Sequence, residues 1–153
     1  MEIDCSNIIY LLIGTIIGLF GNLVLEWKKR KWQEEGEKKK IYGILQSLEK
    51  EIKMGIDRAE SLVKFAENNK VSFSRIYTGI WDSAKLYLTE KIKEQEILWT
   101  LQKIYTKFDL INFNMEAGSI DRTRLASGAA FAKEYIEEIK ENFEKFREKL
   151  IKI

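Results

Sequence analysis

The 153-residue sequence contains no histidine, no proline and a single cysteine, Cys5. Histidine is the commonest general base and metal ligand, so its absence excludes Glu-x-x-His di-iron bundles and Ser-His-Asp or Cys-His nucleophile systems. One cysteine forms neither an intrachain disulfide nor a CxxC metal pair. Because proline normally ends helices and marks loops, its absence predicts long helices and short connections.

Phosphate-binding motifs are missing as well, since neither GxxxxGK[ST] nor G-x-G-x-x-G occurs. The densest acidic groups lie among lysines, a pattern typical of solvated helix faces with weak i,i+4 ion pairs. These groups are Glu49 and Glu51, Glu137 and Glu138, and Glu90, Glu94 and Glu96. We therefore predict no catalytic residue, no cofactor, no metal site and no enzymatic activity.

The longest uncharged apolar run extends from Ile8 to Leu25. As a helix it is about 27 Å long, close to the thickness of the hydrocarbon core of a bilayer. A secretory signal would begin with basic residues and end at a small-residue cleavage site, but this chain begins Met1-Glu2-Ile3-Asp4. We predict a retained transmembrane helix over 8–25, in preference to a signal peptide or a buried core helix.

The distribution of cations predicts the orientation of this helix. Residues 1–7 carry no Lys or Arg, whereas residues 26–40 carry seven. Since Lys and Arg stay on the cytoplasmic side, we expect a short extracytoplasmic segment 1–7, a basic juxtamembrane segment 26–40 and a cytoplasmic domain 41–153 in the cell membrane. The residues that set the topology and the inner interface are Trp27, Lys28, Lys29, Arg30, Lys31 and Trp32.

Small residues within the predicted span favour self-association. Gly14 and Gly18 form a GxxxG pair, followed by Gly21 and Asn22. Glycines four apart let two helix backbones approach closely, and an amide in lipid gains from an interhelical hydrogen bond. We therefore expect the lipid bilayer as one partner and either a homo-oligomer or another protein as a second. Cys5 is either an idle thiol, an acylation site or a bridge between two chains.

Helical periodicity dominates the rest of the chain. Apolar or small residues alternate at spacings of four and three over 37–68, 95–116 and 119–153, and a shorter helix is expected over 78–88. Gly36 is the candidate break before the first of these helices, and Thr78 and Ser119 are candidate N-caps. The predicted fold is all-α, with a four-helix, bundle-like domain whose seams resemble those of a coiled coil and whose neighbours are antiparallel.

Charge and aromatic content leave few functional signals in this domain. Its cations and anions nearly balance, which does not suit a nucleic-acid binder. Trp81, Trp99 and Tyr105 occur among short polar residues, including Asp82 and Asn112. These aromatics either fill the core or line a groove for a partner.

Three segments carry a resemblance to a known class of proteins. They are Glu51-Ile52-Lys53, Gly79-Ile80-Trp81-Asp82-Ser83-Ala84, and Leu101-Gln102-Lys103-Ile104-Tyr105 leading to Ile111-Asn112. With them, the chain resembles small uncharacterised prokaryotic proteins that have one N-terminal membrane helix and a cytoplasmic helical domain. The resemblance implies membrane attachment and no activity, cofactor or catalytic residue.

Three functional hypotheses follow. The first is a membrane-tethered interaction or scaffold module. The second is a membrane-active effector, holin-like or toxin-like, that assembles through its transmembrane helix. The third and weakest is an enzyme that acts near the membrane through carboxylates or tyrosines.

Overall fold

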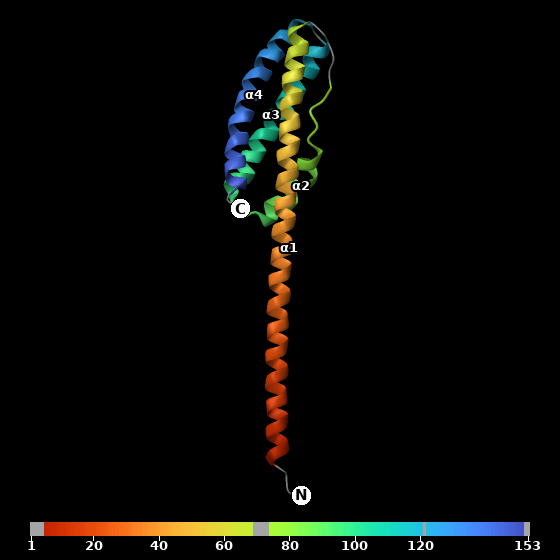
Figure 1. Ribbon diagram of the computed structural model, residues 1–153. Helices are drawn as coiled ribbons and strands as arrows, with labels where there is room; N and C mark the ends of the chain where they lie inside the picture. The colour runs from red at the N-terminus through yellow and green to blue at the C-terminus, as the bar shows by residue number, and fades with distance from the viewer. Residues whose placement is uncertain (1–4, 69–73, 121, 152–153) are drawn as a thin grey trace. The chain divides into compact units, whose positions relative to one another are not determined.

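The structure is a computed structural model that describes the backbone of residues 5–68, 74–120 and 122–151. Side chains are described for 14–68, 74–118 and 125–151. The described part is all helical: α1 (Cys5–Glu67), α2 (Gly79–Lys91), α3 (Gln95–Ile120) and α4 (Arg122–Leu150) (Figure 1). The chain divides into two compact units, residues 1–40 and 41–153, which we describe separately.

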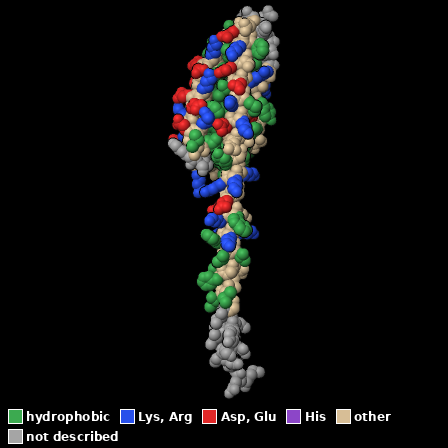
Figure 2. All heavy atoms as spheres, in the orientation of Figure 1, with side chains coloured by type: hydrophobic (Ala, Val, Ile, Leu, Met, Phe, Trp, Pro, Cys, Tyr) green, Lys and Arg blue, Asp and Glu red, His purple; other side chains and the backbone are tan. Residues whose placement is uncertain are grey.

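The first unit consists of the N-terminal part of α1. Every described side chain from Gly14 to Lys40 is exposed, including the apolar ones (Figure 2). The helical backbone continues through Gly36, so this residue does not break α1. Glu26 and Arg30 form an i,i+4 ion pair at 4.0 Å, which supports an exposed helix.

The predicted membrane helix falls within this unit. Over the residues that the structure describes, no helix combines the length and the apolar character that a membrane crossing requires. Residues 8–13 of the predicted span lie outside the described side chains.

The second unit is a bundle built from the C-terminal part of α1 together with α2, α3 and α4. Ion pairs fix the direction of α4, because Arg147 bonds Glu49 at 3.1 Å and Lys140 bonds Glu60 at 3.0 Å. As residue numbers rise along α1 they fall along α4, so these helices are antiparallel. Lys149–Glu96 and Lys107–Glu138, both at 2.7 Å, show that α3 and α4 are antiparallel as well.

Most residues of the predicted seams lie in the core of the bundle, whereas Ile41 and Tyr135 are partly buried. α1 contributes Leu45, Leu48, Ile52, Ala59, Leu62 and Ala66, α3 contributes Ile97, Leu101, Ile104, Phe108, Ile111 and Met115, and α4 contributes Leu125, Ala132, Ile139, Phe143, Phe146 and Leu150. All of them are buried, which confirms the spacing of four and three on each helix. The all-α, bundle-like class is therefore confirmed.

α1 and α3 pack closely against each other and run in the same direction. A Cβ on Gly55 would lie 2.5 Å from Cζ of Phe108, so the two helices approach closely at this point. The hydroxyl of Tyr105 donates a hydrogen bond to Glu51. Glu51 lies one turn before Gly55 and Tyr105 lies one turn before Phe108, so α1 and α3 are parallel. α1 and α3 are separated in the chain by α2, so their parallel course agrees with a bundle whose helices alternate in direction, and the antiparallel pairs α3–α4 and α1–α4 agree with the predicted antiparallel neighbours.

Two predicted helix boundaries also differ. α3 continues to Ile120, past the stop expected after residue 116, so Ser119 lies within α3 and is not an N-cap. A Cβ on Gly118 would lie 3.1 Å from Cα of Leu125, so the lack of a side chain at this position permits the close approach of α4.

Candidate functional site

A buried carboxylate on α1 organises the start of α2. Glu51 is only 2% exposed. It accepts the backbone N–H of Ile80 at 3.0 Å, the N–H of Trp81 at 3.1 Å and the hydroxyl of Tyr105 at 3.0 Å. The first N–H groups of a helix lack partners within it and carry positive partial charge, so a carboxylate is stabilised there. Glu51 therefore caps α2 from a different helix.

This arrangement confirms that Thr78 is the N-cap residue of α2 and corrects the predicted exposure of Glu51. Thr78 holds the N-cap position of α2, but its side chain makes no capping hydrogen bond. Its hydroxyl instead donates to Asp82 at 3.1 Å. Glu51 was placed on a solvated face, which was wrong, because its position next to Ile52 and one turn after Leu48 turns it towards the core.

Two aromatic rings pack against this carboxylate. The rings of Trp81 and Tyr105 stack with centroids 4.9 Å apart and planes 6° apart, and Phe108 meets Tyr105 edge-on at 5.9 Å. Burial, followed by the charge of Glu51, raises the pKa of Tyr105 above its usual range. Tyr105 therefore remains protonated and keeps donating to Glu51.

Asn112 on α3 holds the connection that leads into α2. Its side chain, 3% exposed, accepts the N–H of Ile76 at 2.8 Å and donates to the carbonyl of Ile76 at 3.1 Å. Ile76 itself is buried. One asparagine thus satisfies both backbone groups of a residue in an irregular segment, as buried backbone requires. Glu51 and Asn112 together fix the position of α2.

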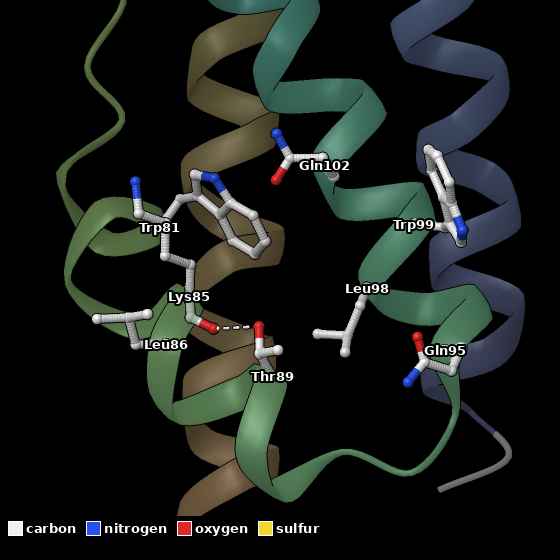
Figure 3. Close-up of a pocket in the computed structure, with 8 residues that line it drawn as sticks. All are labelled: Trp81, Lys85, Leu86, Thr89, Gln95, Leu98, Trp99 and Gln102. Carbon is white, nitrogen blue, oxygen red and sulfur yellow. Dashed lines mark hydrogen bonds between the residues drawn. The ribbon is translucent and has the colours of Figure 1, made fainter.

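A groove of about 370 Å³ lies between α2 and α3. Trp81, Leu98 and Gln102 are directed into the space between these helices, whereas Leu86 and Trp99 point away from it (Figure 3). Its lining contains one charged residue, Lys85. The complete lining is Trp81, Lys85, Leu86, Thr89, Gln95, Leu98, Trp99 and Gln102.

The structure separates the three aromatics that the sequence singled out. Trp81 and Tyr105 are buried and stacked, whereas Trp99 is 65% exposed and takes no part in the stack. Lys103 lies over the Trp99 ring, 6.0 Å from its centroid. The core interpretation is therefore confirmed for Trp81 and Tyr105, whereas a role of Trp99 in binding a partner stays a prediction.

The residues predicted for membrane packing and topology all lie on the exposed first unit. A Cβ on Gly14, Gly18 or Gly21 would meet nothing within 4 Å, and Asn22 is exposed. Lys31 lies 5.6 Å from the centroid of the Trp27 ring. The roles expected of these residues, and of the exposed Lys28, Lys29, Arg30 and Trp32, stay predictions.

The buried carboxylate and the groove differ in the chemical groups that they offer. Both oxygens of Glu51 are engaged with donors inside the fold, so this carboxylate offers no lone pair at the surface for proton transfer. The groove instead presents an indole face, an aliphatic side chain, two amides, a hydroxyl and one ammonium group. Such a mixture of apolar area with a few polar groups suits recognition of another molecule.

Comparison with known proteins found no matching family model, no similar curated protein and no similar solved structure. The resemblance to membrane-anchored prokaryotic helical proteins therefore stays a prediction.

Proposed function

We propose that the chain is a membrane-tethered interaction module, in which residues 8–25 lie in a lipid bilayer and the unit 41–153 recognises a partner at the cytoplasmic face. The observation that carries the proposal is the exposure of an uncharged, largely apolar helical segment over 14–25, whose polar side chains are Thr15 and Asn22. Between residues 16 and 25, seven large apolar side chains are 50–66% exposed: Ile16, Ile17, Leu19, Phe20, Leu23, Val24 and Leu25.

Physical chemistry disfavours water as the environment of such a helix. A helix that is apolar on every side is normally covered by protein or lipid. Burying a single Leu, Ile or Phe side chain gains about 1.5–3 kcal/mol, so covering this set together is strongly favourable. Lipid accepts a helix because all its backbone groups bond within the segment.

Flanking residues support the orientation. The run is followed by Trp27 and four consecutive cations, whereas no cation precedes it. Indole rings favour the headgroup layer, and Lys and Arg stay on the cytoplasmic side. The open backbone at Gly14 and Gly18 also leaves this helix able to pack against a second copy.

Two measurements on the full chain test the proposal. In the first, the protein is reconstituted into vesicles, washed with alkaline carbonate and floated on a density gradient. An anchored chain floats with the lipid, and recovery in the wash would refute the anchor. Dye release from the same vesicles separates the alternative function, since an effector that assembles pores would empty them and a tether would not.

The second measurement determines orientation from the single thiol. A membrane-impermeant maleimide should label Cys5 in intact cells, because residues 1–7 are predicted to lie outside. A variant with Cys5→Ser and Lys93→Cys, which moves the thiol to the turn between α2 and α3, should be labelled only after the membrane is permeabilised. The reverse pattern would refute the cytoplasmic position of the bundle.

A further inference from the structure

The segment that follows the apolar run carries its charges in three successive groups. Residues 26–31 contain four cations and one carboxylate, residues 32–37 contain three carboxylates and no cation, and residues 38–40 are three lysines. The backbone of α1 is helical throughout this segment, and every residue from 26 to 40 is exposed (Figure 2). The sign of the charge therefore alternates along one continuous helix.

The first group places its cations around the whole helix. Lys28, Lys29, Arg30 and Lys31 are consecutive, and consecutive residues of an α-helix are about 100° apart, so the four point in four different directions. They occupy only about 4.5 Å of the helix axis. We call these four residues the cation ring. A ring suits a partner that surrounds the helix, whereas a nucleic-acid binder gathers its cations on one face.

The cation ring lies at the depth expected of lipid headgroups. It begins about 4.5 Å beyond Leu25, the last residue of the apolar run, and ends about 9 Å beyond it. The headgroup layer on each side of a hydrocarbon core is about 5–7 Å thick. Trp27 belongs to the same depth because indole rings favour that layer, and Nζ of Lys31 lies 5.6 Å from the centroid of its ring. With residues 8–25 in the bilayer, the ring therefore reaches the lipid phosphates.

The carboxylate within the first group holds its cation weakly. Glu26 lies 4.0 Å from Arg30, and the two side chains are 70% and 78% exposed. An ion pair between exposed side chains contributes little free energy. A lipid phosphate can replace Glu26 as the partner of Arg30, because a guanidinium group binds phosphate oxygens through two parallel hydrogen bonds.

The second and third groups restrict the contact to the ring. Glu34, Glu35 and Glu37 begin about 4.5 Å beyond the ring, and a helix lying flat on an anionic surface would press them against headgroups of like charge. An upright helix keeps them outside the headgroup layer. Residues 38–40 lie about 20–23 Å beyond Leu25, more than a Debye length of about 8 Å from that layer. Of the three groups, the ring is the one that an upright helix brings to the headgroups.

We propose that the cation ring binds anionic phospholipids of the cytoplasmic leaflet and enriches them around the inner end of the membrane helix. The proposal rests on the proposed membrane anchor and names the class of lipid that the anchor selects. Ammonium and guanidinium groups pair with the phosphate oxygens, and the excess negative charge of an anionic headgroup favours it over a zwitterionic one. Orientation of a membrane helix requires Lys and Arg but no particular lipid, so this selectivity is a separate property.

The test measures which lipids gather around the full chain in vesicles. The double variant Cys5→Ser with Gln33→Cys places the single thiol beside the ring, at an exposed position, where it carries a fluorescence donor. Vesicles of zwitterionic phosphatidylcholine contain a trace of phosphatidylglycerol or phosphatidylcholine with the same acceptor on an acyl chain. Energy transfer should show about fivefold enrichment of phosphatidylglycerol over phosphatidylcholine, the factor that one cation supplies at an anionic surface.

Variants of the donor-labelled chain locate the contact. Replacing all four residues of the ring by glutamine should make transfer to the two acceptors equal. Both leaflets have the same composition, so a change of orientation in the vesicle does not alter this result. The matched control replaces Lys38, Lys39 and Lys40 by glutamine and should keep the preference.

Two further measurements separate charge from shape. A ring in which each lysine is exchanged for arginine and Arg30 for lysine should keep the preference, because it keeps the charge. Raising the salt concentration to about 1 M, where the Debye length is about 3 Å, should weaken it.

Several outcomes would overturn the proposal. Equal transfer to both acceptors from the intact ring, or a preference that survives the glutamine ring, refutes lipid selection. An equal loss in the control at residues 38–40 assigns the effect to net charge and not to the ring. Ring-dependent binding of a single-stranded oligonucleotide, without a lipid preference, makes a nucleic acid the ligand. Flotation is independent: a chain that floats but shows no preference refutes the ring alone, and a chain recovered in the carbonate wash refutes the anchor.

Discussion

Residues 14–40 and 41–67 belong to the same helix, α1, yet their side chains lie in opposite environments. In the first part every described side chain is exposed, although many are apolar. In the second part most of the apolar residues form a seam that is buried in the bundle, although Met54 and Phe65 are exposed. The second part is amphipathic and packs within the chain, whereas residues 14–25 of the first part carry no charge and are exposed on every side.

The largest expected effect comes from placing charge in the first part. Ile16→Arg combined with Leu19→Arg should reduce membrane partitioning by about 5–7 kcal/mol, because each arginine costs about 2.5–3.5 kcal/mol near the centre of a membrane helix. Flotation should be lost, while the urea midpoint of the bundle should not change. The control is Met54→Arg, at a 62%-exposed position of the second part, which should leave flotation intact.

The reciprocal change truncates the buried seam. Leu48 is fully buried, so Leu48→Ala should lower the free energy of unfolding by about 2–5 kcal/mol through lost burial and a cavity. Urea denaturation followed by circular dichroism measures this change, and flotation should be unaffected. A loss below about 1 kcal/mol, as exposed positions show, would mean that Leu48 does not pack in the core.

A third change targets the buried carboxylate. Glu51→Gln replaces one acceptor oxygen with an amide that faces the N–H groups of α2, and should cost about 1.5–3 kcal/mol. Glu49→Gln is the matched control, because Glu49 pairs with Arg147 near the surface and such pairs contribute up to about 1 kcal/mol. Hydrogen exchange should locate the loss: the amides of Ile80 and Trp81 should exchange faster in Glu51→Gln only.

The sequence was sufficient to predict the seams but not the capping of α2. Positions such as Leu45, Leu101 and Phe146 repeat with the period of the helix they lie on, so local spacing alone identifies them. Glu51 is different, since its partners at Ile80 and Trp81 are about 30 residues away and depend on how the helices pack. The candidate site was therefore only partly accessible: its aromatics stood out, whereas the carboxylate that orders them resembled a surface residue.

The roles of the glycines in α1 also depend on how the helices pack, because Gly36 and Gly55 have different surroundings. The candidate break at Gly36 is an exposed helical position with open space around it, and the glycine at Gly55 is required by the ring of Phe108. Composition does not distinguish these roles. Only the position of the neighbouring helix does.

The smallest expected effects come from these two glycines and differ in sign. Gly55→Ala places a methyl group 2.5 Å from the Phe108 ring and should destabilise the bundle by about 1–3 kcal/mol. Gly36→Ala meets nothing within 4 Å and should stabilise the local helix by about 0.5–1 kcal/mol, because alanine loses less backbone entropy. Urea denaturation measures the first, and hydrogen exchange of the amides around residue 36 measures the second. If both substitutions stabilised their surroundings, α1 and α3 would not approach closely at Gly55, and the packing that positions Tyr105 against Glu51 would have to differ.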